Sequence, residues 1–269
     1  MVIYVYTVIA VLFPLVLDKF TPVFRQSYSI WLVPLLFLGA LLALIILNLA
    51  VFAVSVALVN LKKPPRAAGY YKFIAKVTVP LIFKIMRVKI TVKGEDLLPQ
   101  NTRFVMVCNH THIFDPALFM AALPQAEFAF MGKKEIIKEM PFVAKFIHSQ
   151  GGLFVDRENS RGSARAAVDA IRLLKGGKAS LGIFPEGHRT KDGTLQPFKD
   201  GAFKIAMKAG APTAVCAVRG ATEILHNLPF KRSKTEIRVL RVITPPEYEG
   251  KTAAEISEIS RNIMLEDLL

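Results

Sequence analysis

The stretch VCNHTHIFDP, Val107 to Pro116, places two histidines and an aspartate directly after an apolar run. The run RFVMVC, residues 103–108, is typical of a strand that ends just before His110. Asp115-Pro116 is typical of a helix start, with the aspartate at the N-cap and the proline at the first helical position. The stretch therefore predicts a strand, a short loop and a helix, with His110 in the loop.

The sequence around this corner alternates between short strands and helices. Apolar residues at Val88, Ile90 and Val92 predict a half-buried strand. The runs FAFM, LFV, SLGIF, TAVCAV and EIRVLRVI predict further strands. Helical spacing predicts a serine-capped helix over Ser160 to Lys175 and a shorter one that ends at Gly210. Strands interleaved with helices indicate an α/β domain over residues 88–269, with a mixed central sheet flanked by helices.

The first 61 residues have a different composition. The whole chain is 52% hydrophobic with a mean hydropathy of +0.39, which is high for a soluble globule. Met1 to Leu17 carries no charged side chain, and a second uncharged run extends from Gln26 to Leu61. At about 1.5 Å per residue, the second run exceeds the roughly 30 Å hydrocarbon core of a bilayer. We interpret residues 1–61 as a two-helix membrane hairpin, spanning or re-entrant, and favour spanning because of these lengths.

A basic break that contains two prolines, KKPPRAAG at Lys62 to Gly69, follows the hairpin and predicts a domain boundary. Tyr70 to Met86 then mixes apolar residues with three lysines, which suits an amphipathic helix in the membrane interface, kinked at Pro80. A helix packed on the domain with a solvated lysine face is the alternative. Residues 62–87 are therefore predicted to be a basic linker and an interfacial helix.

Basic residues are distributed unevenly around the hairpin. The loop between its two runs contains Lys19 and Arg25 beside Asp18, whereas four basic residues follow the second run. The positive-inside rule therefore places everything after Leu61 in the cytoplasm, on an integral protein of the cell membrane. The four residues that follow are Lys62, Lys63, Arg66 and Lys72.

The part after Leu61 is strongly basic. The net charge of the chain is +14, and leaving out Lys19, Arg25 and Asp18 lowers it by one, to +13. A basic domain tethered to a bilayer favours anionic lipid headgroups or phosphorylated substrates as partners over nucleic acid. The only two cysteines, at positions 108 and 216, lie in apolar runs, which indicates reduced thiols and no disulfide framework.

The separation of five residues between His110 and Asp115 lets their side chains converge across a corner between a strand and a helix. His110 could then take a proton from a hydroxyl with one ring nitrogen while Asp115 holds the other N–H. If that hydroxyl belongs to the substrate, no serine or cysteine nucleophile is needed. The alternative is structural, with Asp115 as a helix cap and His110 as a loop histidine. The spacing HxxxxD alone does not separate the two interpretations.

Three further segments bring charged residues to strand ends, where ligands of α/β domains bind. GGLFVDR ends in an arginine just after a strand, FPEGHR follows another strand, and GKKEIIKEMPF supplies two lysines after a third. An arginine fork suits a phosphate monoester, and a glycine after a carboxylate permits close approach of the backbone. The candidate residues in these segments are Lys133, Lys134, Arg157, Glu186, Gly187 and Arg189.

Taken in order, NHTHIFD, GGLFVDR, FPEGHR and GAPTAVCAV resemble the four motif blocks of the glycerolipid acyltransferase superfamily, most closely the 1-acyl-sn-glycerol-3-phosphate (lysophosphatidate) acyltransferases. The resemblance covers about Lys89 to Ala221, and four ordered blocks are far more specific than one. It implies transfer of a fatty acyl group from a thioester to the sn-2 hydroxyl of lysophosphatidate, giving phosphatidate in phospholipid biosynthesis. Acyl-CoA or acyl carrier protein would be the co-substrate, and no metal or redox cofactor is required.

The same resemblance implies a role for each matched residue. By motif match, His110 would be the general base and Asp115 its orienting partner. Arg157 would bind the phosphate of the acceptor. The remaining matches would shape the acceptor site or add positive charge near it, and they are Glu186, Gly187, Arg189 and Lys134.

The fourth block departs from the family pattern. A second proline usually follows the first within a few residues, but after Pro212 this chain has Val215 and Cys216. The departure weakens any assignment of acyl-chain contacts there, though not the catalytic assignment. The motifs also leave the acceptor open between lysophosphatidate, another lysolipid and glycerol-3-phosphate.

Three other interpretations were weighed. His110, His112 and Asp115 could bind a metal, although further ligands have no obvious source. Cys108 could form an acyl-enzyme, although a small buried apolar group is the simpler role. A non-catalytic membrane protein could bind anionic lipids through the same basic face, but it would not need the histidine-aspartate corner. The sequence therefore favours an acyltransferase without a metal site.

Overall fold

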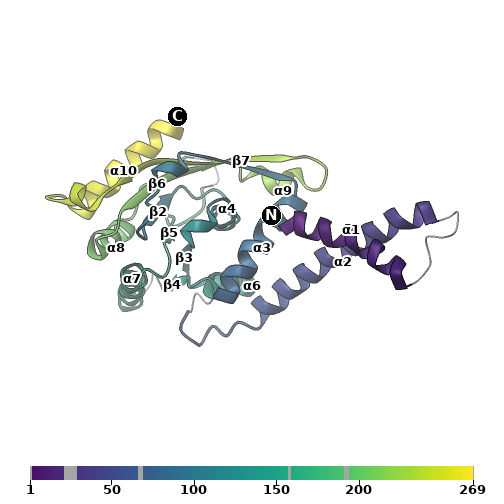
Figure 1. The fold of residues 1–269 in the computed structure, drawn as a ribbon. Helices are drawn as coiled ribbons and strands as arrows, with labels where there is room; N and C mark the ends of the chain where they lie inside the picture. Colours follow the sequence, from purple (N-terminus) through teal and green to yellow (C-terminus); the bar gives the residue numbers. More distant parts are fainter. Residues whose placement is uncertain (1, 21–28, 66–68, 157–158, 191–193, 269) are drawn as a thin grey trace. The chain divides into compact units, whose positions relative to one another are not determined.

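The computed structural model divides into two compact units, Met1–Leu58 and Val59–Leu269 (Figure 1). It describes residues 2–20, 29–65, 69–156, 159–190 and 194–268. Two helices make up the first unit, whereas the second contains a sheet with helices on both of its faces. The boundary lies four residues before Lys62, where the sequence predicts the break.

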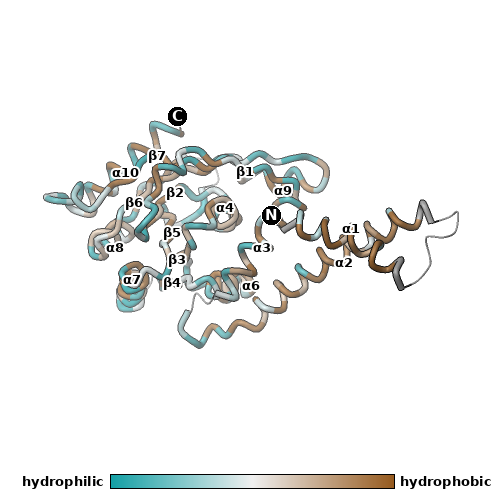
Figure 2. Tube along the Cα trace, in the orientation of Figure 1, coloured by the Kyte–Doolittle hydropathy of each residue, from teal (hydrophilic) through white to brown (hydrophobic). Residues whose placement is uncertain are grey.

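The first unit consists of α1 (Val2–Phe20) and α2 (Ser29–Ala57), which pack against each other. Both are strongly hydrophobic along their length (Figure 2). Leu32–Ala57 is 26 residues long with a mean hydropathy of 2.8, and within the described residues it is the one helix long and apolar enough to cross a bilayer. The apolar part of α1, Tyr4–Leu17, is shorter. One candidate span therefore lies in the second helix of the predicted hairpin.

Seven strands form one sheet in the second unit, in the order β1-β7-β6-β2-β5-β3-β4. The strands β2 to β6 run parallel to one another, β7 is antiparallel to β6, and β1 is parallel to β7. The prediction of an α/β fold with a mixed central sheet is confirmed. The strands are β1 (Val88–Lys93), β2 (Val105–Cys108), β3 (Ala129–Lys133), β4 (Leu153–Val155), β5 (Leu181–Ile183), β6 (Thr213–Arg219) and β7 (Ser233–Ile243).

This topology gathers the ends of several strands at one edge of the sheet. Because β2 to β6 are parallel, all five carboxyl ends lie at that edge, together with the amino ends of β1 and β7. Strand β2 is in the middle, between β6 and β5. The loop after β2 is therefore next to the loops after β5 and β6, and ligands of α/β sheets bind at such an edge.

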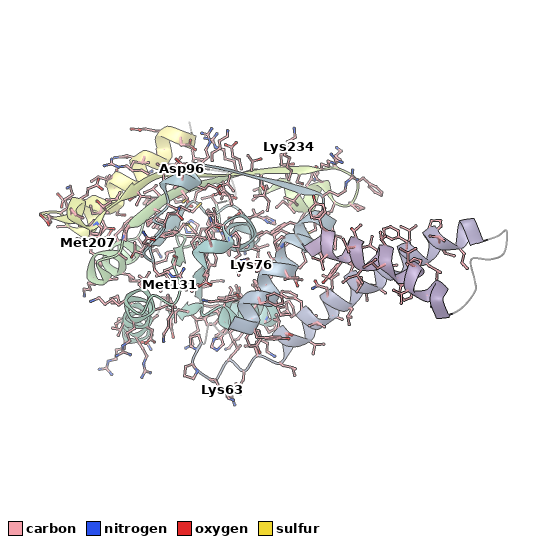
Figure 3. All side chains as sticks on the ribbon, in the orientation of Figure 1. Lys63, Lys76, Asp96, Met131, Met207 and Lys234 are labelled. Carbon is pink, nitrogen blue, oxygen red and sulfur yellow. The ribbon has the colours of Figure 1, made fainter. Side chains whose placement is uncertain are left out.

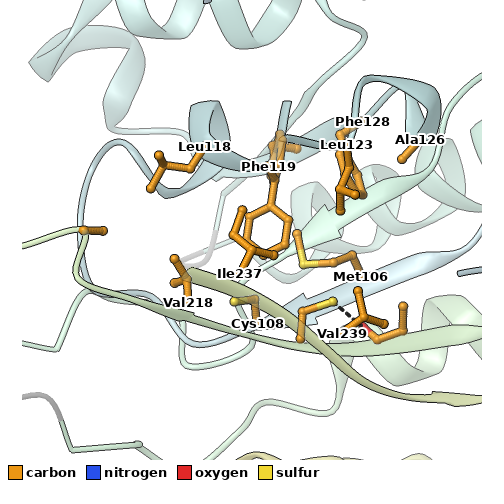
Figure 4. Close-up of a cluster of buried hydrophobic side chains, with 14 of the residues drawn as sticks. Met106, Cys108, Leu118, Phe119, Leu123, Ala126, Phe128, Val218, Ile237 and Val239 are labelled. Carbon is orange, nitrogen blue, oxygen red and sulfur yellow. Dashed lines mark hydrogen bonds between the residues drawn. The ribbon is translucent and has the colours of Figure 1, made fainter. Parts of the chain in front are cut away.

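Side chains of β2 alternate between the two faces of the sheet. Val107 points into a core formed with α7, α8 and α10, whereas Met106 points into a core formed with α3 and α4. Figure 4 shows Phe119 of α4 beside Met106 in the second of these cores. The helices are α3 (Gly69–Ile85), α4 (Asp115–Ala122), α5 (Ile136–Glu139), α6 (Pro141–Ser149), α7 (Ser160–Lys175), α8 (Gly201–Ala209), α9 (Glu223–Asn227) and α10 (Ala253–Leu268), with 3-10 turns at Glu95–Leu97, Pro124–Ala126 and Pro245–Tyr248.

Two helix ends show how the sequence sets the bounds of these elements. Helix α7 has the predicted range, but its N-cap is Asn159, whose side chain accepts two backbone N–H groups of the first turn. The predicted cap, Ser160, was therefore wrong by one position, because asparagine caps as well as serine and stands one residue earlier. Helix α8 ends before Gly210, which has a φ of 64° and adopts the left-handed conformation that favours glycine.

Helix α3 occupies the segment predicted to be amphipathic, and its helical backbone continues through Pro80. Ala75, Val79 and Phe83 pack into the core of the second unit. Lys72 forms an ion pair with Glu127, with 2.9 Å between Nζ and Oε2. The helix thus packs on the domain, as in the alternative interpretation, and this lysine contacts protein. Its place at the membrane interface stays a prediction.

Candidate active site

His110 and Asp115 meet at the carboxyl edge of β2, where the chain turns into α4. His110 Nδ1 lies 2.9 Å from Asp115 Oδ2. The side chain of Asp115 is fully buried, whereas that of His110 is 19% exposed. The pair therefore joins a carboxylate shielded from water to a ring that a substrate can reach.

Asp115 does not cap the helix. Helix α4 begins at Asp115 itself, with Phe114 at the N-cap and no side-chain cap bond. The carboxylate turns back to the loop, where Oδ2 accepts the backbone N–H groups of Thr111 and His112, each at 2.8 Å. The predicted N-cap role was therefore wrong, because the loop supplies these donors close to the carboxylate. The interpretation of Asp115 as a simple helix cap has no support in this geometry.

Asp115 also sets which nitrogen of His110 is basic. An ionised carboxylate only accepts hydrogen bonds, so Nδ1 carries the proton that is shared with Oδ2. Nε2 then has the free lone pair, and none of the hydrogen bonds formed among the described residues uses this atom. Phe184 stacks on the ring, with 4.2 Å between the centroids. The imidazole is thus oriented as a general base requires.

The backbone of His110 is held by the loop that follows β5. Its N–H donates to Glu186 Oε1 at 2.7 Å, and its carbonyl accepts the N–H of Thr190 at 3.0 Å. Both partners lie in the loop after β5, the strand that pairs with β2 in the sheet. Because the N–H and the carbonyl of His110 are both hydrogen-bonded to the loop after β5, this loop fixes the backbone position from which the imidazole extends.

Glu186 belongs to the framework of this corner. It is 1% exposed, and its second oxygen, Oε2, accepts the N–H of Gln196 at 2.9 Å. Burial raises the pKa of this carboxyl, while its hydrogen bonds to the backbone of Gln196 and His110 lower it. Gly187 follows with a φ of 80°, which favours glycine. Since both oxygens of Glu186 bind backbone amides, this side chain shapes the site by holding its loops.

Asn109 is a further residue of the corner, and the sequence analysis missed it. Its Nδ2 donates to the carbonyl of Val218 at 3.0 Å, and its Oδ1 accepts the N–H of Val218 at 2.8 Å. These two bonds mimic a backbone pair and extend the contact between β2 and β6 up to His110. A polar residue directly after a buried strand was the available signal, because a buried amide requires partners.

His112 occupies a different environment from His110. Its Nδ1 accepts the N–H of Phe114 at 3.3 Å, and its half-buried ring packs edge to face with the ring of Phe114. Burial lowers the pKa of His112, and the positive charge of Arg189 lowers it further, against an opposing effect of Asp115. His112 is therefore a neutral residue that stabilises the loop.

The predicted cations are distributed along the edge. Lys134 follows β3, and its Nζ binds Oδ2 of Asp156, the residue before position 157, at 2.9 Å. Arg157 itself lies outside the described residues. Arg189 is exposed and directly precedes Thr190, which contacts His110. The structure thus brings Glu186 to the pair of His110 and Asp115 and Arg189 near it, whereas Lys134 contacts Asp156.

Neither cysteine is placed for nucleophilic chemistry. Cys108 and Cys216 are both fully buried and unpaired, and burial raises the pKa of each thiol. A raised pKa disfavours the thiolate, which is the nucleophilic form. Among the residues that the structure describes, no three side chains of His, Cys, Asp or Glu gather as metal ligands would. The histidine-aspartate corner is therefore the candidate reactive feature among the described residues of this edge.

Comparison with known proteins gives concordant matches. The Acyltransferase family model matches residues 89–219. A 1-acyl-sn-glycerol-3-phosphate acyltransferase of Borreliella burgdorferi is 34% identical over 123 residues, or 46% of this chain and 48% of that protein. The protein of the same name from Haemophilus influenzae is 31% identical over 172 residues, or 62% of this chain and 70% of that protein.

One solved structure is similar over most of the chain. It is the 1-acyl-sn-glycerophosphate (LPA) acyltransferase, PlsC, of Thermotoga maritima, with a TM-score of 0.57 and 25% identity. The similarity covers 73% of this chain and 80% of that one. Against the Borreliella relative, by contrast, the chain spans about half of the length.

Proposed function

Because the chain belongs to the 1-acyl-sn-glycerol-3-phosphate acyltransferase family, we propose that it transfers a fatty acyl group from a thioester to the sn-2 hydroxyl of lysophosphatidate. The products are phosphatidate and a free thiol. The observation that carries the proposal is the 2.9 Å contact between His110 Nδ1 and Asp115 Oδ2 at the carboxyl edge of the sheet. Acyl transfer to a hydroxyl requires a base, and no hydrogen bond among the described residues occupies Nε2 of His110.

The reaction needs one proton transfer and one exchange of bonds at the acyl carbon. His110 Nε2 takes the proton of the acceptor hydroxyl while its oxygen attacks the thioester carbonyl. The resulting tetrahedral intermediate collapses, the carbon–sulfur bond breaks, and the imidazolium returns the proton to the leaving thiolate. Asp115 stabilises the imidazolium through Nδ1–H during these steps, and it stays ionised. Base catalysis of this kind contributes roughly 10²- to 10⁴-fold.

Positioning supplies much of the remaining acceleration, because a thioester is already activated. The corner is held from both sides. Asn109 bonds to Val218 of β6, and the backbone of His110 bonds to Glu186 and Thr190 of the loop after β5. A rigid corner fixes Nε2 relative to the bound hydroxyl, and alignment of this kind lowers the entropic part of the barrier. The residues around His110 thus hold its ring in position, and His110 itself transfers the proton.

The acceptor phosphate is assigned to Arg157 by the family motif. The observation near it is the bond of Lys134 to Asp156, which anchors the residue directly before position 157. A guanidinium at that position could bind a phosphate monoester with two parallel hydrogen bonds. Lys134 would then act by holding Asp156, and the exposed Arg189 would add positive charge close to the pair. Gly187 would permit close approach of the backbone to the acceptor.

The cellular setting follows from the first unit. We assign the protein to the membrane, with residues 1–61 as its integral anchor and the second unit on the cytoplasmic face, because basic residues follow α2. The full chain should resist extraction by high salt and by alkaline carbonate and should require detergent. Release by salt alone would overturn the integral anchor. Labelling of an engineered cysteine in the second unit from the outer face would overturn the orientation.

The test of the activity is consumption of an acyl thioester in detergent. Acyl-CoA and acyl carrier protein are each offered with lysophosphatidate, lysophosphatidylcholine and glycerol-3-phosphate. We expect turnover with lysophosphatidate and at least one donor, without an added metal or redox cofactor. Turnover with another acceptor alone would reassign the substrate. Anionic-lipid binding without any turnover would support the non-catalytic alternative.

A further inference from the structure

The last part of α9 and the segment that links it to β7 expose large apolar side chains. Phe230 is 84% exposed, which is the highest value among the large hydrophobic residues that the structure describes, and Leu225 is 54% exposed. An isolated exposed leucine is ordinary, but two apolar side chains within six residues form a local feature. We call Leu225–Arg232 the apolar-basic loop.

This loop lies at the same edge of the sheet as the catalytic pair. It connects the carboxyl end of β6 to the amino end of β7, and β6 pairs with β2, which leads to His110. Figure 1 shows α9 beside the first part of β7, near the end of α3. The loop is fixed to that end of α3, because Arg87 Nη1 donates to the carbonyl of Phe230 at 2.8 Å and the carbonyl of Arg87 accepts the N–H of Ser233 at 3.3 Å.

The charge around the apolar side chains has one sign. Residues 225–234, LHNLPFKRSK, contain no aspartate or glutamate, and the carboxylates that flank this segment along the chain are Glu223 and Glu236. Lys231, Arg232 and Lys234 are exposed, and Lys234 marks the start of β7 in Figure 3. An apolar tip bordered by cations matches the boundary between acyl chains and anionic headgroups.

We propose that the apolar-basic loop is a second contact with the membrane, in which Phe230 and Leu225 insert among lipids and Lys231 and Arg232 bind anionic headgroups. The partner is an anionic lipid surface. The contact is separate from the helices of the first unit and sets the distance between the bilayer and the edge that carries His110. A lysolipid leaving the bilayer then meets the base without a long passage through water.

Charge complementarity favours lipid over a second copy of the chain as the occupant. The second unit carries most of the net charge of +14, so two such surfaces repel each other, whereas a bilayer with anionic lipids attracts them. The proposal rests on membrane attachment but not on the acyl acceptor. It can therefore be tested without substrate.

The test uses the full chain in nanodiscs and a single tryptophan as a depth probe. The sequence has one tryptophan, Trp31, so Trp31→Phe gives a background in which Phe230→Trp is the only such residue. Lipids brominated on the acyl chain quench indole fluorescence on contact. We expect strong quenching and a blue shift of the Phe230→Trp signal with brominated lipid in discs that contain phosphatidylglycerol.

Leu97→Trp in the same background is the matched control. Leu97 is 49% exposed, but it follows the opposite end of β1 and has Glu95 and Asp96 beside it. Its fluorescence should stay red-shifted and unquenched. A blue-shifted Phe230→Trp signal that brominated lipid does not quench would show a protein contact and overturn the proposal. A red-shifted and unquenched signal would overturn it equally.

A second pair of measurements tests the charge. Lys231→Glu with Arg232→Glu, added to the Phe230→Trp protein, should reduce quenching in discs with phosphatidylglycerol and leave the folded state intact. Raising the salt concentration should likewise reduce the quenching of the Phe230→Trp protein that keeps Lys231 and Arg232. If quenching is independent of both changes, the cationic part of the proposal is wrong. Extraction of the same protein by salt would instead contradict the integral anchor.

Discussion

Two buried carboxylates at neighbouring strand ends serve the same histidine in different ways. Asp115, after β2, binds the imidazole ring of His110 through Oδ2. Glu186, after β5, binds the backbone N–H of His110 through Oε1. Each also accepts backbone N–H groups from its surroundings, and each is almost inaccessible to solvent.

The two carboxylates therefore have different roles in the proposed mechanism. Asp115 acts on the ring of His110, whereas Glu186 holds its backbone. In the proposed reaction the Asp115 carboxylate contacts the ring that gains and loses a proton, so it fixes the tautomer and the orientation of that ring. The Glu186 carboxylate contacts a peptide group that does not react, so its effect reaches the ring only through position. Substitution of Asp115 should therefore lower mainly the catalytic rate, whereas substitution of Glu186 should lower mainly the stability of the fold.

The largest effect is expected at the residue that both carboxylates serve. His110→Ala removes the base, so kcat should fall by roughly 10²- to 10⁴-fold and approach the background rate. Folding and membrane extraction should be unchanged, because the ring is partly exposed. Thioester consumption with lysophosphatidate measures the rate, and the midpoint of thermal unfolding in detergent verifies the fold.

The matched control is the second histidine of the same loop. His112→Ala keeps the backbone N–H that binds Asp115, and it removes a ring that packs on Phe114 and accepts the N–H of Phe114. It should retain substantial activity. An equal loss from both substitutions would contradict the division of roles and favour joint binding of a metal.

A smaller loss of activity is expected when Asp115 is substituted. Asp115→Asn keeps the size of the side chain but removes its charge and places an amide NH₂ where an acceptor is needed. The imidazolium loses its stabilisation and the ring can adopt the wrong tautomer, so kcat should fall by roughly 10²-fold. If Asp115 served only as a helix cap, asparagine would replace it almost without cost. A near-normal rate in this variant would therefore refute the catalytic pair.

Substitution of Glu186 should lower the stability of the fold more than the catalytic rate. Glu186→Gln retains one accepting oxygen, so either the N–H of His110 or that of Gln196 loses its partner. An unsatisfied buried amide costs about 1–3 kcal/mol, and the thermal midpoint should fall accordingly. The rate should decline less than in Asp115→Asn, and the pH dependence of kcat should keep its shape. A shifted pH profile with an unchanged midpoint would assign Glu186 to the chemistry.

The sequence predicted most of the fold because its strong signals are local. All seven strands follow from short apolar runs, and Gly210 marks the end of α8. The separation of His110 and Asp115 across a strand-to-helix corner is also local. The cap positions failed by one residue at Ser160 and at Asp115, since several polar residues compete for the same few backbone donors.

The supporting contacts could not be predicted from local patterns. Glu186 meets His110 across 76 positions, and Asn109 meets Val218 across 109. Such contacts depend on the strand order, in which β5 and β6 flank β2, and no pattern in a single sequence specifies that order. The motif indicated that Glu186 matters, but only the topology shows that it holds the backbone of the base.

The smallest expected effect concerns pH, and it tests whether His112 is a neutral loop residue. Burial lowers the pKa of His112 in the folded state below its unfolded value of about 6.5. As pH falls through that value, the unfolded chain takes up a proton that the folded ring resists, so His112 destabilises the fold in acid.

His112→Asn keeps an acceptor for the N–H of Phe114 and does not titrate. The free energy of unfolding of this variant, minus that of the wild type, should therefore rise from pH 7.5 to pH 5.5. The rise should be less than the about 1.4 kcal/mol that one pKa unit represents, because the ring is only half-buried. A difference that falls over the same range would mean that His112 is protonated in the folded protein, with Asp115 as its partner, and both histidines would then share the carboxylate.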